Sequence, residues 1–388
     1  MKSIIMLTTH YPPPFSGASV RAWNIVKLLS KLKELDRIFI IELSRNSMIP
    51  GQYFNKEYVY TAKDRLLRIL RVMGLNDLGY LKQVKPLAVI ATLPPSLAIK
   101  IGIKTYHKLG IPILCDVQDV TDEYKIGFTN KLYSTIYKSY YATIYKALSL
   151  CDSVYAVTEI MAKIIENKIG KEVHVAPNGS NPDMYKYSYE RFKHKRPCDP
   201  ICTAVFVGSL DWEYQKLDSM IKAIYTLKKE YGLKIKLRIV GMGKYLRYYI
   251  NLAKKLNMLS LVKFYGYVPI NELPDLISSS DFGIVGRPSA RNNWIISSMR
   301  MTVYDYLSAG IPILAFGPPY SYTKLFILRN NVGVYVPSDD PQDIAYYIYC
   351  NLTKLLSIDR EYCRKIGEKY SWDNTLAPII KFIKYIIQ

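Results

Sequence analysis

The chain has 388 residues, of which 49% are hydrophobic and 22% are charged. Its length predicts two or three domains, and its composition excludes a disordered chain, a collagen-like chain and a small disulfide scaffold. The formal charge of +21 predicts attraction to polyanions, whether nucleotide phosphates, anionic lipid headgroups or nucleic acid.

The first residues, MKSIIMLTTH, contain an apolar stretch of about five residues. This stretch is shorter than the roughly 7–15 residues of a signal-peptide core, so it predicts a buried first strand. No apolar run reaches the roughly 18 residues that a membrane-spanning helix needs. We therefore expect a soluble, cytoplasmic protein.

Strand-like and helix-like segments alternate through the first half of the chain. The apolar runs RIFIIEL, LAVIATL, IPILCDV and SVYAVT predict strands, whereas VRAWNIVKLLSKL has its apolar residues at helical spacing. Such alternation predicts parallel strands joined by crossover helices. The pattern begins again near Ile201 and continues through TAVFVGSL, KIKLRIVGMG, FGIVG and IPILAFG.

The repeated pattern predicts an α/β protein with two doubly wound, Rossmann-like domains that face one another across a cleft. We place the N-terminal domain at residues 1–198 and the C-terminal domain at 199–372, because the charged, proline-containing segment between them suits a linker. Residues 373–388 predict an amphipathic helix that can pack back on the N-terminal domain. Ligands of such sheets bind beyond the carboxyl ends of strands, so the segments that follow strands are the candidate sites.

The cysteines and histidines give no sign of a metal site. The six cysteines form no Cys-x-x-Cys pair, and the four histidines are scattered. We therefore expect no metal, and we expect the cysteines to pack as small hydrophobic residues in a reducing compartment.

The first candidate segment is THYPPPFSGASV, after the first predicted strand. Gly17 and Ala18 leave the backbone bare at the beginning of a helix, where free N–H groups and the helix dipole favour phosphate. The alternative is an ordinary strand–helix turn capped by Ser16 or Ser19. A Walker-type loop is excluded, because GxxxxGK[ST] is absent.

The second candidate segment is CDVQDVTDEY, which places four acidic residues after a buried strand. Asp119 is a candidate for binding a sugar hydroxyl or for acting as a base towards an acceptor. The alternative is that these acids cap the N-terminus of a helix.

The third candidate segment is VFVGSLDWEYQKLDSM. Gly208 at the end of a strand permits close approach by a ligand, and Lys216 is then able to reach a diphosphate as a point charge. The alternative is that Lys216 is an ordinary solvent-exposed lysine.

The fourth candidate segment is SSMRMTVYDYLSAGIPIL. Ser298, Arg300 and Thr302 stand at the beginning of a predicted helix, where a phosphate would meet backbone amides, hydroxyls and an arginine. Asp305, further along, is suited to accept hydrogen bonds from ribose hydroxyls. The alternative for Asp305 is a surface charge on the helix.

Together these segments resemble the family-4-like retaining glycosyltransferases, which have the GT-B fold. The likeness extends over nearly the whole chain and rests on the order of its motifs: YPPPFSGAS, CDVQD, CDSVYAVTE, APNGSNPDMY, FVGSL and TVYDYLSAGIPIL. The last motif is similar to the family's K-x-x-E-Y-x-a-x-G-x-P-v signature.

The resemblance implies a nucleotide-sugar donor that is bound mostly by the C-terminal domain. Asp305 takes the place of the family's ribose-binding glutamate, while Gly17 and Ala18 lie in the loop near the donor phosphates. The remaining residues that we assign to the donor are Gly208, Ser209, Lys216, Ser298, Arg300 and Thr302.

The chain departs from the family pattern around the donor phosphates. Ser209 stands where the family has an arginine, and Gln215 stands where it has a lysine, with Lys216 one place further on. Ser297 stands at the first acid of the family's E-x7-E pair. Thr302 stands where the family often has a lysine, a charge that Arg300 is able to supply.

The candidate catalytic residues are Gln118, Asp119 and Lys216. Many family members have a histidine where Gln118 stands, and Asp119 follows it. A retaining enzyme of this kind is thought to lack a protein nucleophile, so its task is to stabilise charge on the departing diphosphate and to hold the acceptor hydroxyl. Because no DxD-like motif is present, we expect a metal-independent mechanism.

Two basic segments with interleaved apolar residues suit an anionic membrane surface: residues 62–75 and 131–148. The alternative is that each segment packs its apolar side on the sheet. If they bind membrane, the acceptor is expected to be a lipid-linked glycan, with the protein peripheral at the cytoplasmic face.

The leading function is transfer of a sugar, expected to be a hexose, from a nucleoside diphosphate to a glycan in polysaccharide or glycoprotein glycan synthesis. The alternatives are a sugar-nucleotide 2-epimerase of the same fold, a non-enzymatic binder of polyanions or nucleic acid, and an inactive transferase. No RNA-binding signature is present, so nucleic acid is not an expected partner.

Overall fold

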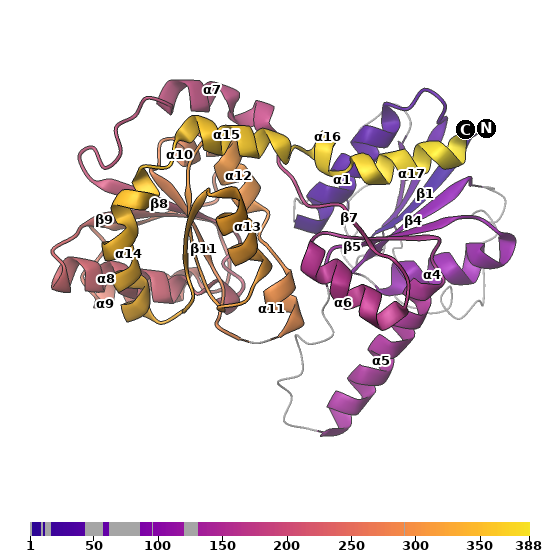
Figure 1. The fold of residues 1–388 in the computed structure, drawn as a ribbon, viewed down its shortest axis with the longest axis horizontal. Helices are drawn as coiled ribbons and strands as arrows, with labels where there is room; N and C mark the ends of the chain where they lie inside the picture. Colours follow the sequence, from indigo (N-terminus) through magenta and orange to yellow (C-terminus); the bar gives the residue numbers. More distant parts are fainter. Residues whose placement is uncertain are drawn as a thin grey trace. The chain divides into compact units, whose positions relative to one another are not determined.

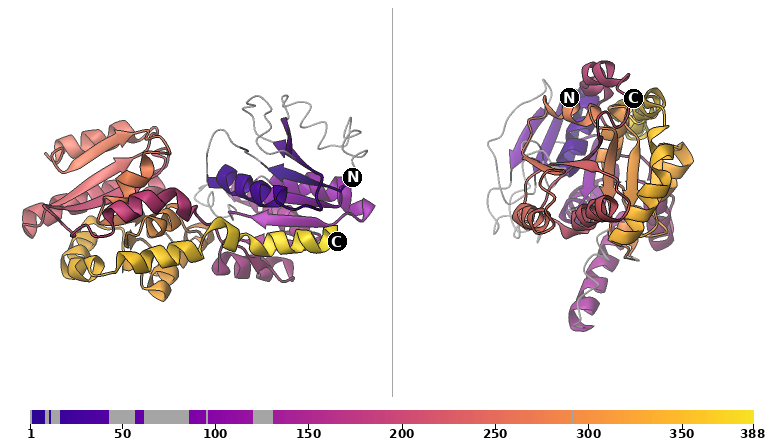
Figure 2. Two further views of the ribbon diagram at one scale, coloured as in Figure 1. Left: turned by 90° about the horizontal axis from the view of Figure 1, so that it is seen from above. Right: turned by 90° about the vertical axis from the view of Figure 1, so that its left-hand side faces the viewer.

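The computed structural model describes residues 2–8, 11, 17–42, 57–61, 86–94, 96–119, 131–290 and 292–388, with the backbone alone at 57–61, 105, 108 and 131–138. The chain divides into two compact units. The first unit comprises Met1–Asn178 and Asp373–Gln388, and the second comprises Gly179–Trp372. Helices flank both faces of the sheet in each unit (Figures 1 and 2).

The first unit contains a seven-stranded parallel sheet with the order β3-β2-β1-β4-β5-β6-β7. Its strands are β1 (Ser3–Thr8), β2 (Arg37–Glu42), β3 (Glu57–Thr61), β4 (Ala88–Leu93), β5 (Ile113–Val117), β6 (Ser153–Ala156) and β7 (His174–Val175). All side chains of β1 and β4 are buried, as expected for parallel strands covered on both faces. The strand order reverses direction at β1 and β4, which makes this the switch point of the sheet.

The helices of the first unit are α1 (Gly17–Ser30), α4 (Ser96–Tyr106), η1 (His107–Leu109), α5 (Lys131–Ser149), α6 (Glu159–Ile169) and α17 (Ala377–Ile387). Helices α4, α5 and α6 enclose one hydrophobic core with the sheet. Helix α17 packs beside α1 and buries Ile379, Ile383 and Ile387. The final segment of the chain therefore belongs to the first unit.

The second unit repeats this topology in a six-stranded parallel sheet with the order β10-β9-β8-β11-β12-β13. Its strands are β8 (Cys202–Val207), β9 (Ile235–Val240), β10 (Val262–Gly266), β11 (Phe282–Gly286), β12 (Ile313–Phe316) and β13 (Gly333–Val336). Strands β8 and β11 form the switch point of this sheet. The predicted fold of two doubly wound, Rossmann-like domains is confirmed.

The helices of the second unit are α7 (Pro182–Phe192), η2 (Glu213–Gln215), α8 (Leu217–Glu230), α9 (Leu246–Lys255), α10 (Leu273–Ser278), α11 (Asn293–Ser297), α12 (Thr302–Ser308), α13 (Tyr322–Asn330), α14 (Pro341–Leu356) and α15 (Arg360–Lys369), with α16 (Trp372–Thr375) at the boundary. Helices α8, α9 and α14 share one hydrophobic core with the sheet. Helix α12 packs against α15 and α7.

The boundary between the units lies at Asn178–Gly179 and not after residue 198. The sequence places α7 in the linker of the first domain, whereas the structure packs α7 on α10 and α12 of the second unit. This packing buries Tyr185 and Tyr189 completely or nearly so, so the helix gains its stability from the second unit.

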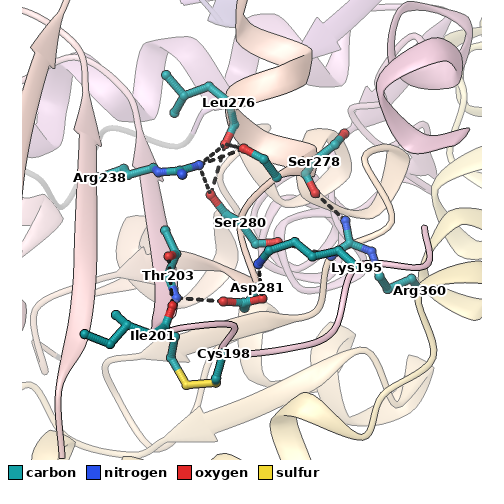
Figure 3. A network of polar contacts seen from close by, with 12 residues as sticks. Lys195, Cys198, Ile201, Thr203, Arg238, Leu276, Ser278, Ser280, Asp281 and Arg360 are labelled. Carbon is teal, nitrogen blue, oxygen red and sulfur yellow. Dashed lines mark hydrogen bonds and ion pairs between the residues drawn. A yellow bond between two sulfur atoms is a disulfide. The ribbon is translucent and has the colours of Figure 1, made fainter. Parts of the chain in front are cut away.

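A polar network fixes the chain where it enters the second sheet (Figure 3). The carboxylate of Asp281, just before β11, accepts a hydrogen bond from the Thr203 backbone N–H at 2.7 Å and pairs with the Lys195 amine at 2.5 Å. Arg360 donates to the carbonyl oxygens of Ser278 and Ser280. The network lies at the amino ends of β8 and β11, opposite the edge where such sheets bind ligands, so we assign it to stability.

Four of the six cysteines form disulfides, Cys115–Cys151 and Cys198–Cys202. Cys115, Cys151 and Cys202 pack in the hydrophobic cores as expected, but all four residues are bonded in pairs, which the sequence does not predict. Cys115 lies in β5 and Cys151 stands two residues before the neighbouring strand β6, so the sheet itself brings them together. Cys363 does pack as a buried free thiol.

No helix within the described ranges is long and apolar enough to cross a membrane.

Candidate functional site

A glycine ends the central strand of the second unit and leaves room for an arginine. Gly208 directly follows β8, and a Cβ built on it would overlap the guanidinium of Arg300. The sequence predicts close approach to Gly208 by a ligand; in the structure, the Arg300 guanidinium lies there. Any larger residue at Gly208 would therefore displace this group.

Arg300 is held at the carboxyl end of β8 without a carboxylate partner in the described part of the chain. Its Nη2 donates to the Val207 carbonyl oxygen at 2.9 Å, and its guanidinium carbon lies 4.9 Å from the Phe206 ring centroid. Its Nη1 is buried and has no hydrogen-bond partner among the described residues. Burial, together with the charge of Arg287, lowers the Arg300 pKa to about 10, so the side chain remains protonated at neutral pH.

Arg287 brings a second guanidinium to the same edge of the sheet. It directly follows β11, the neighbour of β8, and is only 7% exposed. Its guanidinium carbon lies 5.2 Å from the ring centroids of both Tyr214 and Trp294, and its Nη2 donates to Ser298 Oγ at 3.3 Å. Arg287 is not among the residues predicted from the sequence; its signal there is an arginine that directly follows a buried strand.

Gln215, and not Lys216, faces the end of β8. Gln215 is buried, and its Oε1 lies 3.6 Å from the position of a Cβ on Gly208. Lys216 has a positive φ of 52° and pairs through Nζ with Asp339 at 3.0 Å. Burial disfavours the charge of Lys216, but the pairing with Asp339 outweighs it and raises the lysine pKa.

Lys216 lines a pocket of about 530 Å³ that is rich in tyrosine. The residues that form the pocket are Glu213, Tyr214, Lys216, Asp218, Tyr245, Tyr248, Tyr249 and Pro288. Tyr214 contacts both this pocket and Arg287. The pocket therefore adjoins Arg287 through a single aromatic ring.

Ser209 is engaged within its own turn. Its hydroxyl donates to Asp211 Oδ2 at 2.8 Å, and the Lys244 backbone N–H donates to Asp211 Oδ1 at 2.9 Å. The hydrogen bonds from Lys244 and Ser209 lower the Asp211 pKa. Ser209 therefore does not replace the positive charge that the family carries at its position.

Asp305 lies on α12 but faces α7. Burial raises the pKa of Asp305 to about 7, and the neighbouring phenol of Tyr185 opposes this shift. The next residue, Tyr306, accepts a hydrogen bond from the Val207 N–H at 3.1 Å and donates to the Ile284 carbonyl oxygen at 3.4 Å. Helix α12, which begins at Thr302, is thus tied to both central strands.

The candidates of the first unit gather around a buried ion pair. Arg21 and Asp116 are both fully buried and lie 2.7 Å apart, and Gln118 Nε2 donates to Asp116 at 3.1 Å. Gln118 and Asp119 directly follow β5, and both are half-buried.

The remaining candidates of the first unit lie near α1 or outside the described residues. Gly17, which is exposed, and Ala18, which is half-buried, begin the first turn of α1. Ser16, Asp122, Glu123 and the basic segment 62–75 lie outside the described residues, as do the side chains of 131–138.

The structure therefore brings together Gly208, Arg300 and Ser298 from the sequence analysis, with Arg287 and Gln215 beside them. Lys216, Ser209 and Asp305 belong to the same unit but make separate contacts. Among the described residues, no three His, Cys, Asp or Glu side chains are placed to hold a metal ion.

Residues 190–370, most of the second unit, match the family model of the group 1 glycosyl transferases. The protein is a glycosyltransferase. No curated protein sequence matches the chain.

Solved structures agree with the fold of the glycosyltransferase. Anabaena HepE in complex with UDP-glucose has a TM-score of 0.69 at 14% identity, covering 99% of this chain and 100% of its own. Sucrose-phosphate synthase from Thermosynechococcus elongatus scores 0.73 at 12% identity, covering 100% and 99%. The lipopolysaccharide outer core galactosyltransferase WaaB scores 0.69 at 13% identity, covering 99% of each chain. The predicted GT-B fold is confirmed.

Proposed function

We propose that this glycosyltransferase moves a hexose, with retention of configuration, from a nucleoside-diphosphate sugar to a glycan acceptor. The observation that carries the proposal is the Arg300 guanidinium at the end of β8, whose buried Nη1 has no hydrogen-bond partner among the described residues. A phosphate oxygen of the donor is the partner that fits this group, because guanidinium and phosphate form charge-assisted hydrogen bonds.

The physical reason is that a buried, unsatisfied donor is unfavourable by about 1–3 kcal/mol. A diphosphate at the end of β8 removes this penalty and neutralises a charge held in a poorly solvated place. As the bond to the sugar breaks, negative charge grows on the diphosphate, and a fixed cation stabilises that charge without rearranging. Arg300 thereby favours departure of the nucleoside diphosphate.

Residues of the first unit are proposed to act on the acceptor. Gln118 is oriented by its hydrogen bond to Asp116, and Asp119 follows it at the end of β5. We assign Asp119 to accept the proton of the acceptor hydroxyl and Gln118 to position that hydroxyl. Asp305 is proposed to accept hydrogen bonds from the donor ribose. No metal is required for these roles.

The similarity to HepE in complex with UDP-glucose supports a nucleotide sugar as donor and makes UDP-glucose the first to test. The experiment is a thermal-shift panel of UDP-glucose, UDP-galactose and GDP-mannose, followed by nucleotide release with and without glycan acceptors. The proposal expects a rise in Tm with at least one donor, and transfer only with an acceptor. No shift and no release with any donor would contradict it, and conversion of donor alone would indicate an epimerase.

The acceptor is further proposed to be lipid-linked and reached at the cytoplasmic face of an anionic membrane. The net charge of +21 supports this, as does α5, where Tyr140 is 41% exposed and Lys146 is exposed. Flotation with anionic and neutral liposomes tests it: stronger binding to the anionic vesicles is expected, and equal binding to both would contradict it.

A further inference from the structure

Two arginines of like charge converge at the carboxyl edge of the second sheet. Arg287 directly follows β11, and Arg300 lies just before α12. They are linked through Ser298, which accepts a hydrogen bond from Arg287 and stands two residues before Arg300. The charge of Arg287 opposes the protonated form of Arg300. Their like charges oppose one another, and an anion bound beside both would relieve this effect.

Arg287 is held rigidly. The rings of Tyr214 and Trp294 meet edge to face at 4.9 Å between centroids, and each lies 5.2 Å from the guanidinium carbon of Arg287. The backbone N–H of Arg287 donates to the Phe316 carbonyl oxygen at 3.0 Å. A cation fixed by two rings and a strand end is preorganised for a ligand.

The loop that follows β8 does not supply the cations that its resemblance leads one to expect. Ser209 is bonded to Asp211, and Gln215 is an uncharged residue. Lys216, the nearest lysine of the loop, pairs with Asp339. Positive charge at the end of β8 therefore comes from outside the loop.

We propose that Arg287 is a second diphosphate-binding residue, and that Arg287 and Arg300 together replace the two cations missing from residues 209 and 215. The proposal rests on the proposed function, since it assumes a nucleoside-diphosphate donor. The two guanidiniums offer planar sets of donors to two adjacent phosphates. They therefore favour a nucleoside diphosphate over a monophosphate, and the bound diphosphate removes their mutual repulsion.

The alternative is that Arg287 only fills the space between Tyr214 and Trp294. The two roles differ in their effect on the ligand-free protein. A packing residue lowers Tm when it is replaced, whereas replacing one of two repelling cations leaves Tm unchanged or raises it. The ratio of diphosphate to monophosphate affinity provides a second distinction.

The experiment is calorimetric titration of wild type, Arg287→Gln, Arg287→Lys and Arg247→Gln. Arg247 is an exposed arginine on α9 of the same unit, so it controls for loss of one charge. The probes are whichever of UDP, GDP and ADP binds wild type most tightly, and its monophosphate. Arg287→Lys keeps the charge and serves as the test if Arg287→Gln does not fold.

We expect Arg287→Gln to weaken diphosphate binding by about 10- to 100-fold and monophosphate binding far less, with ligand-free Tm retained. Arg287→Lys is expected to lie between wild type and Arg287→Gln, and Arg247→Gln to change affinity at most about fivefold. Unchanged diphosphate affinity in the Arg287 variants, or a loss of both affinities with a lower Tm, would overturn the inference alone. A wild-type protein that binds none of the three diphosphates would overturn the proposed function as well.

Discussion

Two arginines in this glycosyltransferase, the buried Arg21 and the half-buried Arg300, have opposite surroundings. Arg21 of the first unit is paired with Asp116 and also donates to the carbonyl oxygens of Ala176 and Pro177. Arg300 of the second unit has no carboxylate partner among the described residues and has one unsatisfied nitrogen. Arg21 therefore serves stability, whereas Arg300 is suited to a ligand.

Replacing Arg21 with methionine is expected to destabilise the first unit by about 3–5 kcal/mol, because it leaves Asp116 as a buried charge without its cation. Urea unfolding followed by circular dichroism measures the change. The control is the double variant Arg21→Met with Asp116→Leu, which removes both charges and is expected to lose less. If Arg21→Met alone is as stable as wild type, the ion pair does not contribute to the stability of the first unit.

Asp305 gives a stability change with pH. Its pKa of about 7 in the folded protein lies above the ordinary value of 3.8, so the folded state binds the proton more tightly than the unfolded state does. The stability that this group contributes is present below about pH 4 and is lost as the pH rises through about 7. Asp305→Asn should match wild type in Tm near pH 4 and exceed it at pH 8; a Tm difference that does not vary with pH would contradict this.

The sequence allows prediction of Gly208 and Arg300 because each stands at the end of a recognisable element. It marks Arg287 only as a residue that directly follows a predicted strand, because the meeting of Arg287 with Arg300 depends on the pairing of β11 with β8. Lys216 illustrates the reverse case. The sequence places it near the donor phosphates, but its positive φ and Asp339 direct its amine elsewhere.

At the scale of elements, strand β11 permits the close approach of α12. A Cβ on Gly283 would overlap the ring of Tyr306, which lies between β8 and β11 and bonds to both. Because Gly283 has no side chain, α12 packs close to the sheet, and Arg300 is brought close with it.

Gly283→Ala is expected to destabilise the second unit by about 1–3 kcal/mol through overpacking and to weaken diphosphate binding by moving α12. Thermal unfolding and calorimetry measure the two effects. Gly232→Ala is unsuitable as a control because of its positive φ; Ser357→Ala, at the exposed end of α14, is a better one. Wild-type Tm and affinity in Gly283→Ala would refute this account of α12.

The boundary between the two domains is harder to predict from the sequence than the helices and strands themselves. Proline and charge before residue 199 suit a linker, yet α7 buries two tyrosines in the second unit. Short amphipathic helices carry no sign of which sheet they cover, so only tertiary packing decides. The disulfide between Cys115 and Cys151 was missed for a similar reason, because it depends on the pairing of β5 with β6.

At the scale of the whole molecule, the same strand order occurs in both units, apart from the short β7. The sequence predicts this because each half alternates apolar strands with helices, a pattern that admits few topologies. The resemblance to glycosyltransferases likewise rests on the order of motifs along the chain. The candidate site is harder to predict than the fold, because its charged residues are not contained in any single motif.

The most direct test of the central claim is the dissociation constant of the preferred nucleoside diphosphate for Arg300→Gln, measured beside wild type and Arg247→Gln. The account predicts that Arg300→Gln binds about 10- to 100-fold more weakly than wild type, with a similar ligand-free Tm and with Arg247→Gln near wild type. Equal affinity in wild type and Arg300→Gln would contradict it.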